Sequence, residues 1–345
     1  TVPAGYYDNV LAYVKAEADA NERLHNTKST ENSRVILALT AIGKDVTNVG
    51  GHNLLKGLDN MAYLQKQGIN GPIWALIALD SHEYTLLGDV TREKLLQVIL
   101  GAALPSGGWS HSGETADPDM TAMAIQALAP YYKTNEAVKS AVDKALGVLS
   151  GIQREDGGFS SWGTVNSESC AQVVVALTAL GIDPAVDGRF IKNGMSVLDA
   201  LCGFYVTGGG FGHDNTTYDQ MATEQAYYAL AAYYRLVNKQ TSLYDMSDVC
   251  IGHKFGEWAV TKEATCTEAG SRTRTCAVCG AVETETIKAL GHSLTAVAAK
   301  AATCTDPGNS AHWDCARCGK SFSDAAAKTE IAKDSWVIAA LGHDE

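Results

Sequence analysis

The stretch "QREDGGF" (153–159) decides the fold of the first 247 residues, because its Gly-Gly-aromatic turn recurs at a regular interval. The same turn occurs in "LPSGGWSHSG" (104–113) and again in "VTGGGFGHDN" (206–215). Successive glycine pairs lie 50 and then 52 residues apart. A period of this length is typical of folds built from repeated supersecondary units that stack on one another. The sequence therefore predicts a repeat architecture.

Each turn joins two predicted helices of different composition. Before the second turn, "AVDKALGVLSGIQ" (141–153) places four apolar residues on one stripe at helical spacing, which indicates an amphipathic helix: Val142, Leu146, Leu149 and Ile152. After each turn comes a helix with small residues on nearly all faces, which indicates packing on both sides. We therefore expect small-residue helices in an inner layer and amphipathic helices outside it. The inner helices are "MTAMAIQALA" (120–129), "CAQVVVALTALG" (170–181) and "TEQAYYALAAYY" (223–234).

Two weaker helix pairs precede these three. They are "YYDNVLAYVKAE" (6–17) with "ENSRVILALTAIG" (31–43), and "HNLLKGLDNMAYLQKQ" (52–67) with "GPIWALIALD" (71–80). The sequence thus predicts five helical hairpins, which can stack as an open solenoid or close as a barrel. We expect closure, because the ends of an open array should be polar and the first predicted helix is not.

The Gly-Gly-aromatic turns resemble the Q-x-x-D-G-G-W/F repeat of the prenyltransferase and squalene-cyclase α/α-toroid superfamily. "DPDMTA" (117–122) is similar to the D-x-D-D-T-A motif of squalene–hopene-type cyclases. More closely still, residues 1–247 resemble the terpene cyclase-like toroid domains of large surface proteins of anaerobic gut Firmicutes. This resemblance implies a mainly α protein with an α/α toroid at the cell surface. Such toroids usually have six hairpins, so we expect one further inner helix in the full domain.

Asp117 and Asp119 have two interpretations. In the cyclases, the middle acid of the motif protonates an alkene or epoxide, and Asp119 matches that acid. Met120, however, stands where the motif has a second Asp that shapes this acidity. The structural alternative makes Asp117 the N-cap of a helix, with Pro118 and Asp119 in its first turn. We expect capping, with ligand contact and proton donation as alternatives; an enzyme would be a cyclase-like isomerase or lyase.

The resemblance also implies a binding pocket. In a closed toroid the N-termini of the inner helices point to one end, where aromatic and acidic side chains would gather. Such a mixture suits a small ring-bearing molecule or glycan: a sugar, sterol, bile acid or corrinoid. The alternative is that Trp109, Phe159 and Phe211 only plug the turns. The candidate ligand-binding residues are Trp109, His111, Trp162, Glu168, His213, Tyr218, Asp219 and Glu224.

Two other chemistries of the superfamily fit less well. Zinc-assisted thiol prenylation needs an Asp-x-Cys and a later His, whereas this chain has Glu168 and Cys170 and no His in its last inner helix. Cys170 is therefore expected to be a small core residue. A corrinoid-binding toroid would need a second β-rich domain to hold the ligand, and the rest of the chain does not resemble one.

The net negative charge argues against binding to nucleic acid or to anionic membrane surfaces. The 39 acidic and 27 basic residues give a net charge of -12, which repels nucleic acid and anionic membrane surfaces. No stretch approaches the ~18 uninterrupted apolar residues of a membrane span. The sequence opens at Thr1 without an apolar signal segment, so we expect a soluble fragment or a mature chain.

The remainder of the chain contains a second repeat. Residues 252–290 and 291–341 share Gly-His, Ala-Thr-Cys-Thr and Cys-x-x-Cys-Gly in the same order, and a third Gly-His begins at Gly342. Each unit has one His and three Cys, which make a complete tetrahedral zinc shell, whereas three thiols cannot all pair within a unit. We therefore expect β-rich, zinc-ribbon-like modules at 251–290 and 291–345, with Cys250 at the junction.

The predicted zinc ligands follow from one shell per unit. They are His253, Cys266, Cys276 and Cys279 for the first site, and His292, Cys304, Cys315 and Cys318 for the second. If each unit uses the trailing His instead, His292 and His343 take over, and His312 competes locally. A disulfide in each unit is the alternative, because units this short need a metal or a crosslink to fold. The repeats resemble Cys-rich modules of Firmicutes surface proteins, which implies a stalk between toroid and wall anchor.

Overall fold

The computed structural model describes residues 2–86 and 88–343, which divide into two units, Thr1–Gly252 and His253–Glu345. Within the described residues all helices lie in the first unit, and the second is built from small antiparallel sheets. The expectation of a mainly α protein with β-rich C-terminal modules is confirmed at this level. Among the helices described, none combines the length and apolar character that crossing a membrane requires.

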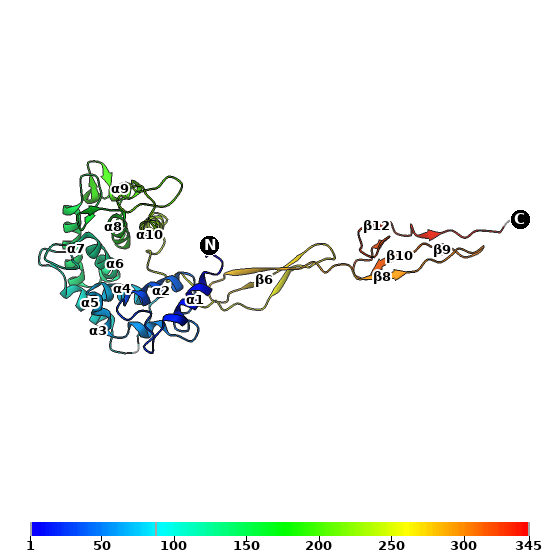
Figure 1. Ribbon diagram of the computed structural model, residues 1–345, viewed down its shortest axis with the longest axis horizontal. Coiled ribbons are helices and arrows are strands. Elements are labelled where there is room, and N and C mark those ends of the chain that lie inside the picture. The colour runs from blue at the N-terminus through cyan, green and yellow to red at the C-terminus, as the bar shows by residue number, and fades with distance from the viewer. Residues whose placement is uncertain (1, 87, 344–345) are drawn as a thin grey trace. The chain divides into compact units, whose positions relative to one another are not determined.

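The small-residue helices form consecutive neighbours. Each packs against the next, and Figure 1 shows them in a curved row. In α8 every residue from Ser169 to Thr178 is buried, so this helix is covered on nearly all faces, as its small side chains predict. The row consists of α2 (Thr30–Ala41), α4 (Asn70–Asp80), α6 (Pro118–Leu128), α8 (Ser167–Ala179) and α10 (Gln220–Val237).

Amphipathic helices flank this row. In α7 (Glu136–Ile152), Val138, Val142, Leu146 and Leu149 are buried. Ile152, expected on the same stripe, is exposed because it is the last residue of the helix. Helix α5 packs on α4, α7 on α6 and α9 on α8. The other flanking helices are α1 (Tyr6–Glu17), α5 (Arg92–Gly101) and α9 (Val197–Cys202).

The helix expected over residues 52–67 is instead broken into three short pieces. These are η1 (Leu54–Leu58), α3 (Met61–Leu64) and η2 (Gln65–Gln67). The side chain of Asn53 accepts a hydrogen bond from the Leu55 N–H, and that of Asn60 accepts one from the Tyr63 N–H. Each Asn thus caps a new start, and this local bonding competes with continuation of one helix.

The repeated turns have the same backbone hydrogen bonds. In the second turn, Gly157 N–H donates to Arg154 O and Arg154 N–H donates to Gly158 O, each at 3.0 Å. Gly157 has φ +80°, and a Cβ there would lie 2.6 Å from Ser196 O, so only glycine fits. The aromatic residues that follow the turns are buried, as the plugging alternative predicts. They are Trp109, Phe159 and Phe211.

Short connecting elements complete the first unit. They are η3 (Ala129–Tyr131), η4 (Gly188–Phe190), the antiparallel pair β1 (Ser160–Ser161) and β2 (Thr164–Val165), and the antiparallel pair β3 (Ile191–Lys192) and β4 (Met195–Ser196).

The second unit has little apolar core. Its buried apolar side chains, within the described part of the tail, are Cys266, Cys276, Cys315 and Phe322. Three of these four are cysteines, so something other than apolar burial must stabilise the unit. The first sheet has the order β5 (Ala259–Lys262), β6 (Gly270–Thr275), β7 (Val282–Ile287). The second has the order β12 (Glu330–Ile331), β11 (Ser321–Phe322), β10 (His312–Cys315), β8 (Leu294–Val297), and β9 (Gly308–Asn309) pairs with β13 (Val337–Ile338).

Candidate metal centres and a candidate ligand pocket

Two groups of four Cys and His residues could each hold a metal ion. In each group the ligand atoms all lie within 4.8 Å of one another. One group is Cys250, His253, Cys276 and Cys279, and the other is Cys266, His292, Cys315 and Cys318. Both therefore present three sulfur atoms and one imidazole nitrogen, a donor set typical of structural zinc.

The distances within the groups match a tetrahedral shell. Bond lengths of ~2.3 Å to sulfur and ~2.0 Å to nitrogen place neighbouring ligand atoms about 3.8 Å (sulfur to sulfur) and about 3.5 Å (sulfur to nitrogen) apart. Cys266 Sγ lies 3.8 Å from Cys315 Sγ. Cys318 Sγ lies 3.5 Å from His292 Nδ1. A disulfide would need sulfurs about 2.05 Å apart, so this geometry is that of ligands around a shared centre.

A tight turn shapes each Cys-x-x-Cys-Gly segment. Gly280 N–H donates to Cys276 O, and Gly319 N–H donates to Cys315 O, each at 2.9 Å. Both glycines have φ near +70°, which a left-handed turn requires. In the first turn, Val278 N–H also points at Cys276 Sγ, at 3.4 Å. The knuckle therefore directs backbone donors at the sulfur that would bind the metal.

These contacts change the acidity of the thiols. Desolvation raises the pKa of Cys276, but hydrogen bonds from backbone N–H groups and from His253 outweigh it and bring the pKa to about 6. The same balance brings the pKa of Cys315 to about 5. Desolvation and the neighbouring thiols raise the pKa of Cys266 to about 11. The lowered pKa of Cys276 and of Cys315 favours the thiolate, the form that binds metals.

The structure groups the ligands differently from the sequence prediction. Cys266 was assigned to the first site but lies in the second group; Cys304 was assigned to the second site but belongs to neither. Strand β6, whose six residues span about 20 Å at ~3.3 Å per residue, lies between Cys266 and Cys276. Cys266 therefore cannot meet its own knuckle and instead meets that of the next module. Alternating "GSRTRT" (270–275) was the signal for this extended strand.

Asp117 is a helix cap, as expected. Its side chain accepts a 3.0 Å hydrogen bond from Met120 N–H at the start of α6, and its other oxygen accepts a 2.5 Å bond from Ser161 Oγ. Asp119 lies in the first turn, and its buried Oδ1 has no hydrogen-bond partner among the described residues. Desolvation, with the negative charges of Asp117 and Glu168, raises the pKa of Asp119 to about 6.

At the start of α6, α8 and α10, a Thr or Cys side chain contacts the aromatic residue of the preceding turn. Thr121 Oγ1 accepts a 3.0 Å hydrogen bond from Trp109 N–H, and Thr223 Oγ1 accepts a 2.9 Å bond from Phe211 N–H. Cys170 has the same position in α8, where burial raises its pKa to about 12 despite a backbone hydrogen bond from Phe159. Cys170 thus has the core position that was expected for it.

The eight predicted ligand residues differ widely in exposure and in their contacts. Trp109 is wholly buried, and its Nε1 donates to Ile99 O at 2.7 Å. Trp162 is 83% exposed and Tyr218 is 59% exposed, while His111 and Glu224 are also exposed. His213 Nδ1 lies 2.9 Å from the Glu168 carboxylate, and Asp219 caps α10. None of the eight lines the cavity described next.

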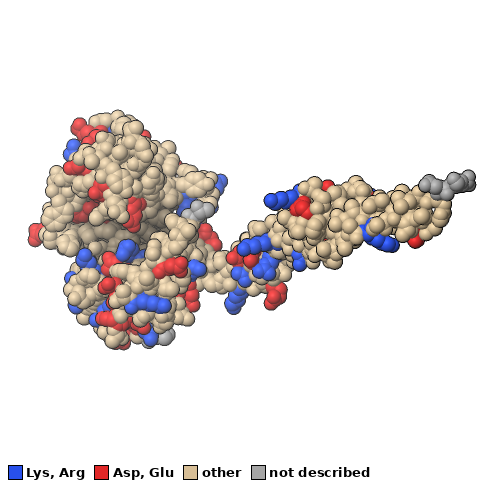
Figure 2. All heavy atoms as spheres, turned by 45° about the vertical axis from the view of Figure 1, so that its right-hand side comes forward, with Lys and Arg blue, Asp and Glu red and all other residues tan. Residues whose placement is uncertain are grey.

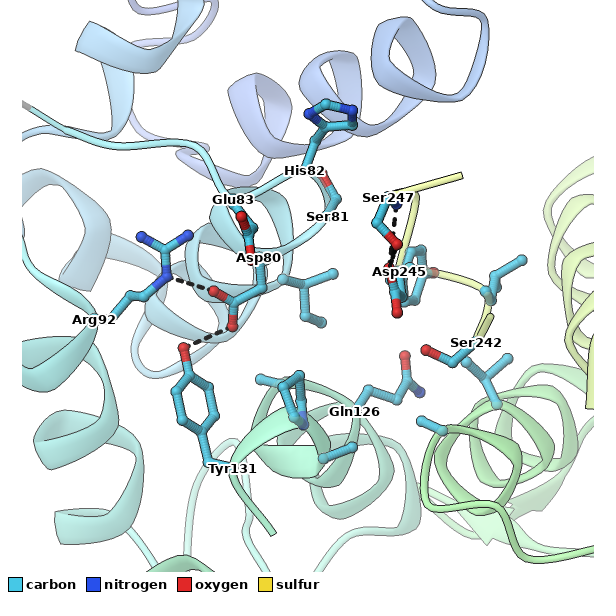
Figure 3. A pocket seen from close by; sticks show the side chains of 18 residues that line it. Asp80, Ser81, His82, Glu83, Arg92, Gln126, Tyr131, Ser242, Asp245 and Ser247 are labelled. Atoms are coloured by element: carbon cyan, nitrogen blue, oxygen red, sulfur yellow. Dashed lines mark hydrogen bonds and ion pairs between the residues drawn. The ribbon is translucent and has the colours of Figure 1, made fainter. Parts of the chain in front are cut away.

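A cavity of about 830 Å³ lies at the opposite, C-terminal ends of α4, α6 and α8. Residues 242–247, after α10, contribute to its wall. Figure 3 shows its polar side chains. The polar lining residues are Asp80, Ser81, His82, Glu83, Arg92, Gln126, Tyr131, Ser242, Asp245 and Ser247. Exposed carbonyl groups at helix C-termini add acceptors and a partial negative charge at this end.

Asp80 is an acid of this cavity with a hydrogen bond to each of its two carboxylate oxygens. Arg92 Nε donates to Asp80 Oδ1 at 2.6 Å, and Tyr131 OH donates to Oδ2 at 2.8 Å (Figure 3). Desolvation raises the pKa of Asp80, and these two donors act against it. Both oxygens are bonded, so Asp80 is held in place as a carboxylate.

Gln126 is a buried cavity residue with an unused acceptor. Its side chain is only 5% exposed, and its Nε2 donates to Gln172 O at 3.0 Å and to Gln172 Oε1 at 2.9 Å. Gln172 Nε2 in turn donates to Gln225 Oε1 at 2.9 Å. Gln126 Oε1 is buried and has no partner among the described residues. An oxygen in this state can accept a hydrogen bond from a ligand.

Sequence reasoning missed this cavity, although a signal was present. Each of the three later inner helices has a Gln in the middle of its run of small residues: Gln126, Gln172 and Gln225. A polar residue in a helix covered on both sides needs a partner, which indicates a polar network or a ligand. No family model matches the chain, and no curated protein is similar to it.

Proposed function

We propose that the helical unit is an α/α toroid that binds a small hydroxyl-rich ligand, such as a saccharide, at the C-terminal ends of its inner helices. The observation that carries the proposal is Gln126 Oε1, a buried acceptor without a partner among the described residues, on a side chain that lines a cavity of mixed polar and apolar character. Because this oxygen has almost no accessible surface, the Gln126 side chain would have to turn for a ligand hydroxyl to reach it. Leaving the oxygen unsatisfied costs about 1–3 kcal/mol.

The lining favours a polyol over a sterol or a prenyl chain. Carboxylates, hydroxyls and an amide surround the cavity, together with the rings of Tyr131 and Tyr244. An apolar ligand would bury these polar groups without giving them partners, which is unfavourable. A sugar can donate to Gln126 and to carboxylates while packing a face on an aromatic ring. Acidic and basic side chains are mixed on the face in Figure 2, which offers no continuous basic surface to nucleic acid.

The tail is proposed to be a zinc-stapled stalk, outside the cell, that holds the toroid away from a surface. Three thiolates and an imidazole at tetrahedral distances favour zinc over the hard, oxygen-seeking cations. When bound, the metal would supply the stabilisation that the small apolar core does not. Extracellular placement rests on the resemblance of the repeats to surface modules.

A ligand screen tests the toroid proposal. The probes are neutral sugars such as glucose, galactose, N-acetylglucosamine and lactose, and the measurement is the melting temperature of the full chain. A shift that Gln126→Met removes supports the proposal. If no neutral sugar gives a shift at millimolar concentration, the saccharide assignment is wrong.

A cyclase-type enzyme is the second candidate, because Asp119 has the raised pKa and partly buried site of a general acid. Against it, buried Met120 replaces the carboxylate that the cyclase motif places beside this acid. The test is incubation with squalene and with soluble oligoprenyl diphosphates. Cyclised products that Asp119→Asn abolishes would establish the enzyme; we expect none.

A further inference from the structure

The repeat in the tail leaves three Cys and His side chains outside both metal groups within the described residues, and one of these, His312, is buried and stacks on Trp336. The other two, Cys304 and His343, are exposed. In sequence they are the counterparts of Cys266 and His292, since both pairs combine Ala-Thr-Cys-Thr with the following Gly-His.

The backbone around the two pairs is the same. Gly291 N–H donates to Cys266 O at 3.0 Å, and Gly342 N–H donates to Cys304 O at 3.1 Å. One residue earlier, Leu290 N–H donates to Thr265 O and Leu341 N–H donates to Thr303 O, each at 2.9 Å. These bonds place the residue after each glycine, His292 or His343, next to its cysteine.

The turns that precede these contacts also agree. Thr265 N–H donates to Glu268 O at 3.0 Å, and Thr303 N–H donates to Asp306 O at 2.9 Å. A Cβ on Gly270 would clash with Lys262 O, and one on Gly308 would clash with Lys300 O. The likeness therefore extends beyond the ligand residues to the fold of the whole segment.

Cys266 and His292 become a four-ligand group only because a knuckle, Cys315 and Cys318, completes them. From this equivalence we propose that Cys304 and His343 are half of a third metal site, completed by the Cys-x-x-Cys-Gly knuckle of another module of the same type. Binding releases the thiol protons to solvent and involves no oxidation, because thiolates and imidazole bind the ion directly. Two ligands alone make a weak site, whereas four make a stable one.

This inference rests on the proposed metal binding by the tail, and the experiment separates the two. The full chain is loaded with Zn²⁺ or Co²⁺ and mixed with a synthetic peptide of residues 313–322, "WDCARCGKSF", which carries one knuckle. Native mass spectrometry counts metal ions and peptides per chain, and the absorption of Co²⁺ reports its thiolate ligands. Without peptide we expect two metals; with peptide we expect a third metal and one bound peptide.

The variants assign the third metal to the half site. Cys304→Ser and His343→Ala should each lose the peptide and the third metal while keeping the first two, which verifies that the tail is folded. Cys202→Ser, at an exposed cysteine outside the tail, should keep all three, and a peptide with both cysteines changed to Ser should not bind.

Three results would overturn the inference. One is retention of two metals with no third in the presence of peptide. Another is peptide binding that survives Cys304→Ser. The last is a zinc-dependent dimer in which two copies pair their Cys304 and His343, because the half site would then not take a knuckle. Failure to retain even two metals would instead refute metal binding by the tail as a whole, and this inference with it.

Discussion

Cys266 Sγ lies 3.8 Å from Cys315 Sγ, although 49 residues separate the two cysteines in the sequence. The first belongs to one sequence repeat and the second to the next, so one candidate metal centre joins two consecutive modules. A metal there would fix one module against the next as well as stabilise each of them. Metal binding is therefore coupled to the folding of the tail and to the packing of one module against the next.

Metal removal should unfold the tail but leave the helical unit folded. The tail has few buried apolar side chains, so its folding free energy is largely that of metal binding, whereas the helices have a continuous core. Addition of a chelator should make residues 253–343 exchange their amide hydrogens rapidly, with the far-ultraviolet helix signal unchanged. Protection of β6 and β10 that persists without metal would contradict this.

Gln126→Met should abolish sugar binding. The change removes the acceptor in the cavity at nearly constant volume and costs about 1–3 kcal/mol of stability from the lost buried hydrogen bonds. Wild-type protein at 100 times Kd should gain about 2.7 kcal/mol, a shift of roughly 5 °C or more, which the variant should lack.

Gln153→Met is the matched control. Gln153 is also buried, its Oε1 also has no partner among the described residues, and its Nε2 donates to Gly157 O and Phe190 O outside the cavity. It should lower stability similarly and keep the ligand-induced shift. Equal loss of the shift in both variants would mean that the effect is general destabilisation.

Asp119→Asn should stabilise the protein at pH 7.5 but hardly at pH 4. The folded pKa of about 6 exceeds the unfolded value of 3.8, so the folded state binds more protons between these values and loses stability as pH rises through them. The loss is at most about 3 kcal/mol, at 1.36 kcal/mol per pH unit. Urea unfolding at the two pH values measures this loss. A stability gain for Asp119→Asn that is equal at both pH values would argue against the raised pKa.

Asp117→Ala should cost about 1 kcal/mol at pH 7.5, because it removes the cap of α6.

Gly157→Ala should destabilise the helical unit more than Gly163→Ala. Both glycines have φ near +80°, so both substitutions cost about 1–2 kcal/mol of backbone strain. Only at Gly157 would the new Cβ meet a backbone oxygen at 2.6 Å, whereas at Gly163 it meets open space. Thermal unfolding of the two variants gives the comparison. Equal losses would mean that close packing of the repeat turn contributes nothing.

The sequence predicted what depends on local pattern. Small residues on nearly all faces of α8 implied a helix covered on most sides, and Asp117 before Pro118 implied a cap. The composition of the knuckles implied metal ligands. What could not be predicted depends on distance along extended chain. The extended strand β6 keeps Cys266 away from Cys276. Counting the ligands within one repeat does not take this distance into account.

The cavity was missed for a related reason. Its residues come mainly from the C-terminal ends of α4, α6 and α8 and from a loop after α10, whereas the Gly-Gly-aromatic turns precede α6, α8 and α10 and mark their N-terminal ends. The repeat therefore points to the N-terminal end, where Trp109 is buried and Trp162 faces solvent. The buried Gln126 was visible in the sequence, but its unused oxygen is apparent only once Gln172 is placed beside it.

The most direct test of the metal-stapled tail is the number of metal ions that Cys266→Ser retains, measured by native mass spectrometry under non-oxidising conditions. Cys304→Ser is the matched control, because it removes the equivalent cysteine of the next repeat. The shared centre predicts two ions for the wild type and for Cys304→Ser, and one ion for Cys266→Ser, with Cys276 and Cys279 still protected from alkylation by the first centre. Loss of the first centre in Cys266→Ser, or a metal-free wild type with Cys276 in a disulfide, would contradict it.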